Sequence, residues 1–230
     1  MWREWMNVLS GWSTTAIIWR LAIATVMGAV IGIDRGLKRR GAGIKTHALV
    51  CLGSALVMLT SQYMMIQFDR QADLARLGAQ VISGVGFLGV GTILITEKQR
   101  IKGLTTAAGL WTCACVGLAV GIGFVEGAIY ALLFIAVVLR ILNRLDLFLQ
   151  RHAKVFDLYL ELEDGKSIES FLQKMRDRNV KTELIETRKM QEPWQYTSLV
   201  ISLEMDHFGE RSDLIRDIRE LDYVHYVEEM

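Results

Sequence analysis

Residues Thr14–Ile33 read TTAIIWRLAIATVMGAVIGI, and Arg20 is the only charged side chain in this stretch. A helix needs about 20 mostly apolar residues to cross roughly 30 Å of hydrocarbon. Four more stretches of similar composition follow, separated by short polar segments, at residues 46–66, 77–96, 104–121 and 125–142. The sequence therefore predicts an α-helical membrane bundle of five transmembrane helices, within a domain of residues 1–150.

Charged residues divide the chain into a basic part and an acidic part. Residues 1–154 hold 16 Lys or Arg against seven Asp or Glu, a net charge of +9, whereas residues 155–230 hold 10 against 18, a net charge of −8. The basic residues gather after the first, third and fifth predicted helices. Because cytoplasmic loops are rich in Lys and Arg, we expect a multi-pass protein of a bacterial inner membrane, with its N-terminus outside and its C-terminus cytoplasmic. The acidic tail argues against nucleic-acid binding.

The tail, residues 155–230, has the short alternating runs of a soluble α+β domain. Val155–Leu162 alternates as a strand does, and residues 167–178 carry apolar side chains at helical spacing. Two strands, a helix and a last strand are predicted at residues 181–190, 196–205, 210–221 and 223–227. This βαββαβ order is ferredoxin-like. A domain of roughly 75 residues is small for independent stability, which favours a homodimer.

Two charged residues of the first predicted helix cannot both lie outside the membrane. If the helix began after Arg20, the apolar residues left before Asp34 would be too few to cross. If it begins at Thr14, Arg20 lies about 9 Å deep. Arg20 then either snorkels to the outer interface or serves a function. Asp34 and Arg35 form either an interfacial charge pair or a site in which Asp34 is an ion or proton ligand, and Asp34 is the best metal candidate.

Two glycine patterns point to close helix packing. Gly28, Gly32 and Gly36 recur every four residues and give the first helix a smooth face. Residues 84–91 read GVGFLGVG, which contains the G-x-G-x-x-G spacing of dinucleotide-binding sites. Such a site needs a preceding strand and an acidic residue about 20 positions later, and this stretch, which lies inside a predicted membrane helix, has neither. We therefore interpret this stretch as packing glycines or as a broken, re-entrant helix that forms an ion site. Its candidate residues are Gly84, Gly86, Gly89 and Gly91.

Polar residues also gather where the second and fourth predicted helices begin. Lys45, Thr46 and His47 could hold an anion or a lipid phosphate, or they could serve as membrane anchors with Thr46 as the helix N-cap. Thr105 and Thr106 could cap the fourth helix or bond to its neighbours, after a turn at Gly103.

The tail offers two candidate ligand loops, which are plain turns in the alternative reading. They contain Asp164 and Gly165 in the first half, and His207 and Gly209 in the second. No catalytic constellation is evident along the chain, so we expect neither an enzyme nor a cofactor. The three cysteines lie in apolar stretches and are interpreted as packing residues.

Four membrane motifs in this order resemble the MgtC/SapB family. They are IGIDR at 31–35, GIKTHALV at 43–50, GVGFLGVG at 84–91 and GLTTAAGLW at 103–111, which ends at Trp111. The resemblance covers residues 16–142. Asp34 stands where the family has Glu, and Lys45 stands where it has Arg, which removes bidentate recognition at that position.

The resemblance implies an inner-membrane protein linked to magnesium limitation, stress adaptation and, in pathogens, virulence. It also implies an ACT-like C-terminal domain of ferredoxin-like form. The partners that it implies are the lipid bilayer and other membrane proteins, including the ATP synthase or transporters. Our leading interpretation is a regulatory or accessory protein that acts through such contacts. The alternative is a transporter of Mg²⁺ or another ion that uses Asp34 and Arg20.

Overall fold

The computed structural model describes residues 8–37, 41–68, 73–96, 101–151, 153–163, 166–189, 196–205 and 211–230. Among these, the side chains of eleven helix and strand residues, Asp34 included, are not described. The chain divides into two compact units, residues 1–143 and 144–230, and each is described by itself.

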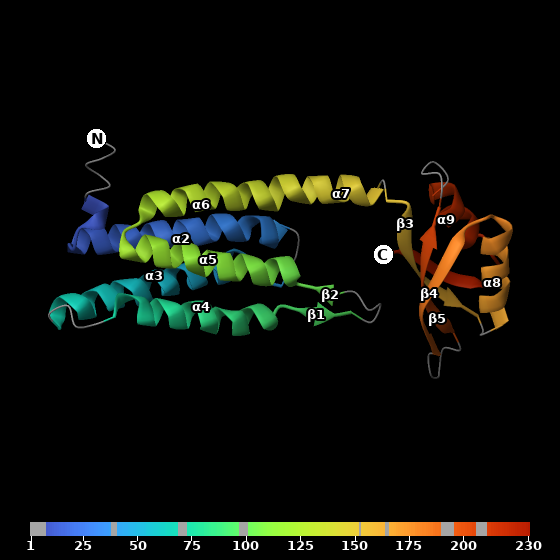
Figure 1. Cartoon of the computed structure of the whole chain (residues 1–230), viewed down its shortest axis with the longest axis horizontal. Coiled ribbons are helices and arrows are strands. Elements are labelled where there is room, and N and C mark those ends of the chain that lie inside the picture. The colour runs from blue at the N-terminus through green and yellow to red at the C-terminus, as the bar shows by residue number, and fades with distance from the viewer. Residues whose placement is uncertain are drawn as a thin grey trace. The chain divides into compact units, whose positions relative to one another are not determined.

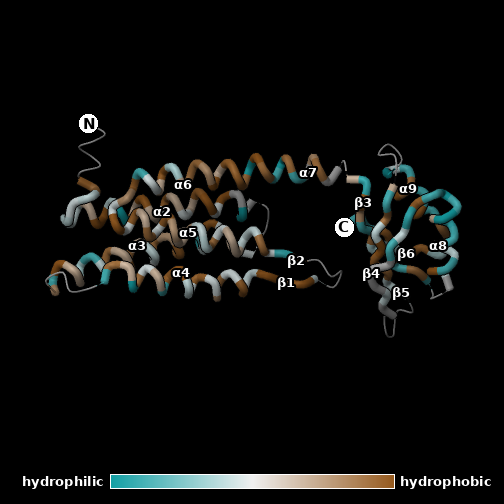
Figure 2. Tube along the Cα trace, viewed as in Figure 1, coloured by the Kyte–Doolittle hydropathy of each residue, from teal (hydrophilic) through white to brown (hydrophobic). Residues whose placement is uncertain are grey.

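The first unit is a bundle of apolar helices that lie side by side (Figure 1). Hydrophobic residues predominate along these helices (Figure 2). The helices are α2 (Thr14–Leu37), α3 (Ile44–Gln67), α4 (Leu74–Val90), α5 (Leu104–Ile122) and α6 (Val125–Val137), which ends in a π-helical turn, η1 (Val138–Leu142). The next helix, α7 (Asn143–Arg151), belongs to the second unit from residue 144 onward.

Four helices in the described part of the chain are long and apolar enough to cross a membrane. They cover Thr14–Ile33, Ile44–Gln67, Leu104–Ile122 and Val125–Asp146, close to four of the predicted stretches. The remaining helix, α4, has 17 residues, at the lower end of the length that a span requires. The prediction that it continues to residue 96 was wrong. The residues after Gly91 are mostly β-branched, and Leu94–Ile95 (β1) pairs antiparallel with Ile101–Lys102 (β2).

Glycines bring α2, α3 and α5 into backbone contact. A Cβ atom built on Gly28 of α2 would lie 2.6 Å from the His47 carbonyl oxygen of α3. From α5, a Cβ atom on Gly117 would lie 2.2 Å from the Cys51 oxygen. Any side chain at these positions would therefore push the helices apart. The smooth face predicted on α2 is confirmed at Gly28 and Gly32, whereas Gly36 has only ordinary contacts with Ile44.

The glycines of α4 behave differently. The helix continues unbroken through Gly84 and Gly86 to Val90, so the broken-helix interpretation was wrong. A Cβ atom on either glycine would meet nothing within 4 Å, so neither one packs closely against a described neighbour. Gly89 does, because its Cβ would lie 3.4 Å from the Cβ of Ala107.

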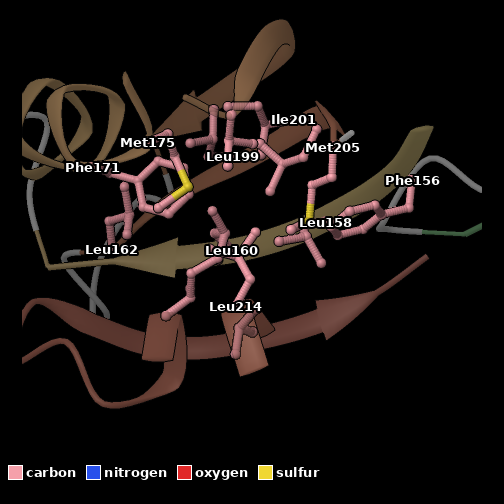
Figure 3. Packing of buried hydrophobic residues seen from close by; sticks show 14 residues of the cluster. Phe156, Leu158, Leu160, Leu162, Phe171, Met175, Leu199, Ile201, Met205 and Leu214 are labelled. Carbon is pink, nitrogen blue, oxygen red and sulfur yellow. The ribbon is translucent and has the colours of Figure 1, made fainter. Parts of the chain in front are cut away.

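The second unit has a four-stranded antiparallel sheet with two helices that share one core with it. Its elements are β3 (Val155–Leu162), α8 (Lys166–Asp177), β4 (Lys181–Lys189), β5 (Thr197–Glu204), α9 (Arg211–Arg219) and β6 (Val224–Glu229). The strand order is β4-β5-β3-β6, the ferredoxin-like arrangement predicted from the sequence. Alternate residues of β3, namely Leu158, Leu160 and Leu162, point into the core, where Phe171 of α8 and Leu214 of α9 meet them (Figure 3).

Candidate functional site: two buried polar centres in the membrane unit

The first polar centre surrounds Arg20, whose side chain is fully buried. Its Nε donates to the Leu9 carbonyl oxygen at 2.6 Å, and its Nη2 donates to the Gly11 oxygen at 2.9 Å. Nη1 donates to Oε1 of Gln62 at 2.9 Å and to the Gly121 oxygen at 3.1 Å. The guanidinium therefore joins the segment before α2 to the C-terminal ends of α3 and α5.

Of the two alternatives for Arg20, the structure does not show a side chain that extends to the surface of the unit, because Arg20 is fully buried. Its acceptors are three backbone carbonyls and one amide, all of them neutral, so the structure compensates the desolvated cation by hydrogen bonds. Asp34 does not take part. The two residues are separated by fourteen positions on α2, or about 21 Å at 1.5 Å per residue. Asp34 and Arg20 are therefore too far apart to form a direct pair, and in the transporter interpretation they would act at separate places.

Sequence reasoning missed the residues that receive Arg20. Backbone oxygens leave no trace in a sequence, and Gln62 stands inconspicuously near the end of an apolar run. Gly123 could have been recognised in the sequence as the end of a helix, because glycine is the residue that most readily adopts a positive φ between two helices. Gly123 has φ +94 and ends α5 beside the guanidinium.

Three more polar residues of the membrane unit are each at most 1% exposed, namely Arg35 of α2, His47 of α3 and Thr106 of α5. The second polar centre is the surroundings of His47. Nδ1 of the His47 ring lies 2.9 Å from the Gly43 carbonyl oxygen. Because a carbonyl oxygen can only accept a hydrogen bond, Nδ1 carries the proton and donates it. Nε2 then presents a lone pair toward α5, where a Cβ atom on Gly109 would lie 3.4 Å away. Helices α2 and α3 are in contact here, since a Cβ atom on Gly28 would lie 2.6 Å from the His47 carbonyl oxygen.

Two of the four sequence motifs meet at His47, because Gly109 belongs to the motif at residues 103–111, but several residues of these motifs do not take part. Lys45, Thr46 and Thr105 are exposed. Trp111 is 47% exposed. The prediction that Thr46 is an N-cap was wrong, since Gly43 occupies that position and α3 begins at Ile44.

Other predicted site residues lie outside the description. Asp164, Gly165, His207 and Gly209 are not among the described residues, nor is the side chain of Asp34. Within the described part of the chain, no group of three or more His, Cys, Asp or Glu side chains is placed to hold a metal ion.

The motifs of the second polar centre fall in a segment that matches a known family. The match is to the MgtC family and covers residues 21–148, more than half of the chain. The chain belongs to the MgtC family. The family segment contains Arg35, His47 and Thr106, and it begins directly after Arg20.

Curated members of the MgtC family include close relatives. The chain is 34% identical over 207 residues to an Escherichia coli protein named "Putative magnesium transporter YhiD", covering 88% of this chain and 93% of that one. It is 34% identical over 187 residues to SapB of Bacillus subtilis, covering 76% and 78%. It is 40% identical over 118 residues to MgtC of Salmonella typhimurium, covering 51% and 48%. No solved structure matches the chain.

Proposed function

We propose that this MgtC-family protein is a regulatory or accessory protein of the bacterial inner membrane, which serves adaptation to magnesium limitation. It acts through contacts with other membrane proteins and catalyses no reaction. The N-terminus lies outside, and the C-terminal unit lies in the cytoplasm as an ACT-like sensing or dimerisation module. The loop charges support this orientation, and the ferredoxin-like strand order supports such a module.

The observation that carries the proposal is the charge of Arg20. Its four acceptors are neutral, and among the described residues no carboxylate is bonded to it, so its positive charge stays inside the bundle. An arginine at such a depth is an electrostatic barrier to cations. Mg²⁺ is held through carboxylates and its own waters, and it dehydrates reluctantly. The surroundings of Arg20 therefore favour a structural role over a path for Mg²⁺.

The outer face of α6 supports contact with a partner. Only 11% of the span Val125–Asp146 is buried inside the unit, against 33% to 50% for the other three long spans. Its exposed apolar side chains include a set that recurs at helical spacing along one face, namely Tyr130, Leu133, Phe134, Val137 and Ile141. Aromatic and aliphatic faces of this kind pack against lipid or against another transmembrane helix.

The rival proposal is a transporter of Mg²⁺ or protons that uses Asp34. The printed name of the YhiD relative favours it, and so does the position of a carboxylate within α2. In this proposal Asp34 would act without Arg20.

Flux measurements separate the two proposals. The purified protein and its Asp34→Asn variant are placed in proteoliposomes, and Mg²⁺, proton and K⁺ movements are recorded beside empty liposomes. We expect no flux above that of the empty liposomes with folded, inserted protein. Flux that disappears in Asp34→Asn would overturn the regulatory proposal and establish the transporter.

Partner capture tests the regulatory proposal directly. Membranes from magnesium-starved cells are cross-linked, and proteins bound to the wild type are compared with those bound to Phe134→Ala. Phe87→Ala is the matched control, because Phe87 on α4 is also a strongly exposed phenylalanine, 83% exposed against 71% for Phe134. We expect a specific membrane partner that Phe134→Ala loses and Phe87→Ala keeps. Recovery of no specific partner, other copies of the chain included, would count against the proposal.

A further inference from the structure

An open groove of about 580 Å³ runs between α3 and α4 on the surface of the membrane unit. Its size falls in the range of sites for small ligands. The walls are almost entirely apolar, and α3 contributes Gly53 and Val57 while α4 contributes Gly84 and Leu88. A Cβ atom on Gly53 or Gly84 would meet nothing within 4 Å, so the two glycines keep the groove open.

One end of the groove is polar and positively charged. Lys45 and Thr46 line it there, and both side chains are exposed. In the part of the chain that the structure describes, no carboxylate pairs with Lys45. The N-cap of α3 is Gly43, which makes no side-chain hydrogen bond to the first N–H groups of the helix. This end therefore suits an anion, and the remainder suits a hydrocarbon chain.

The length of the groove decides between a lipid and a transmembrane helix. From Lys45 to Val57 the groove follows α3 for twelve residues, or about 18 Å. One leaflet of a hydrocarbon core of roughly 30 Å is about 15 Å deep. A bound transmembrane helix would cross both leaflets and would therefore also cover the other half of α3. It would not require a positively charged residue at one end of the groove. A single acyl chain below an anionic headgroup fits both the length and the charge.

We propose that the groove between α3 and α4 is a binding site for an anionic phospholipid. Its phosphate lies against Lys45 and Thr46 at the start of α3, and one acyl chain lies along the apolar walls. Basic sites between transmembrane helices bind anionic headgroups in this way. The site is separate from both buried polar centres, and it does not depend on the proposed regulatory function.

Native mass spectrometry of the full-length protein tests the headgroup end. The protein is equilibrated in mild detergent with equal amounts of phosphatidylglycerol and phosphatidylcholine, and the retained lipid is counted. We expect phosphatidylglycerol to be preferred and Lys45→Ala to lower its retention about fivefold. Lys102→Ala is the control, because Lys102 is exposed but does not line the groove. Equal retention of both lipids, or no effect of Lys45→Ala, would overturn the proposal.

The apolar part of the site has its own matched pair. Gly84→Leu fills the groove, whereas Gly86→Leu adds the same side chain to the same helix outside the groove, and both positions have open space. We expect only Gly84→Leu to reduce phosphatidylglycerol retention. Gly53→Leu, which fills the groove from α3, replaces Gly84→Leu if that variant does not fold. An equal loss of phosphatidylglycerol retention in Gly86→Leu would refute the lipid site. A change in the mass of the assembly in Gly84→Leu, with lipid retention unchanged, would also refute it and would assign the groove to another copy of the chain.

Discussion

Gly123 lies so close to Arg20 that a Cβ atom built on it would sit 2.9 Å from Nη2 of the guanidinium. Gly123 also has φ +94, a conformation that side chains disfavour. Gly123→Ala should therefore lower the free energy of unfolding by about 1–3 kcal/mol. Thermal unfolding in detergent measures the change, and Gly86→Ala, at an open helical position, is expected to keep the wild-type midpoint. Equal midpoints for the two variants would contradict the packing described around Arg20.

Replacing Arg20 by Lys should destabilise the bundle although the charge is kept. One ammonium group cannot reach acceptors that lie around a planar guanidinium, so some of the Leu9, Gly11, Gln62 and Gly121 oxygens lose their donor. Each buried acceptor left unsatisfied costs about 1–3 kcal/mol. In the same unfolding experiment, Arg140→Lys should have the wild-type midpoint, because Arg140 is exposed. A wild-type midpoint for Arg20→Lys would mean that these bonds add little stability.

Gly117→Ala should separate α5 from α3. The added Cβ would lie 2.2 Å from the Cys51 oxygen and 2.8 Å from the Ser54 Cβ, and a backbone atom cannot move aside as a flexible side chain can. Overpacking of this kind costs about 1–3 kcal/mol. Gly53→Ala on the open side of α3 is the comparison, and its unfolding midpoint should stay near the wild type. A tolerated Gly117→Ala would show that the two helices lie farther apart.

Cysteine labelling checks the same interface without a mutation. Cys51 and Cys113 are fully buried, whereas Cys115 is partly exposed. In the folded protein, we expect a small maleimide to modify Cys115 before the other two. Denaturation in SDS should expose all three, which provides the control. Rapid modification of Cys51 in the folded protein would be inconsistent with the contact between α3 and α5.

Phe171→Ala should destabilise the C-terminal unit. Phe171 of α8 is fully buried against β3, and removal of a buried Phe side chain costs about 3–5 kcal/mol. Pulse proteolysis of the full chain would detect this as earlier cleavage within residues 144–230. Val155→Ala, at a position 52% exposed, should leave the cleavage unchanged.

The elements that repeat a local pattern could be predicted from the sequence. The predicted strand Val155–Leu162 has the bounds of β3, because alternate leucines there face one core. The end of α4 could not be predicted in this way. Apolar β-branched residues are compatible with both a membrane helix and a strand. Pairing of Leu94–Ile95 with Ile101–Lys102, across a short connection, makes this segment a strand.

The candidate site was predictable only in part. His47 and Thr106 stand in motifs, and the structure buries both. The role of Arg20 was not predictable, because its acceptors are mostly main-chain oxygens that any residue would supply. The openness of Gly84 and Gly86 was also hidden, since a glycine that admits a neighbouring helix and one that leaves a groove look alike in a sequence.

The four bonds of Arg20 set an order for assembly during synthesis. The bond to Gly121 joins residues 101 positions apart, and the bond to Gln62 joins residues 42 apart. When α2 leaves the ribosome, Leu9 and Gly11 are present but Gln62 and Gly121 have not yet been made. A charged side chain within a lone membrane helix is costly, at about 2.5–3.5 kcal/mol when it lies at the helix centre. The bond to Gln62 becomes possible with α3, and the set of four bonds is complete only when α5 arrives. A nascent chain released before Gly121 would lack the last of these bonds.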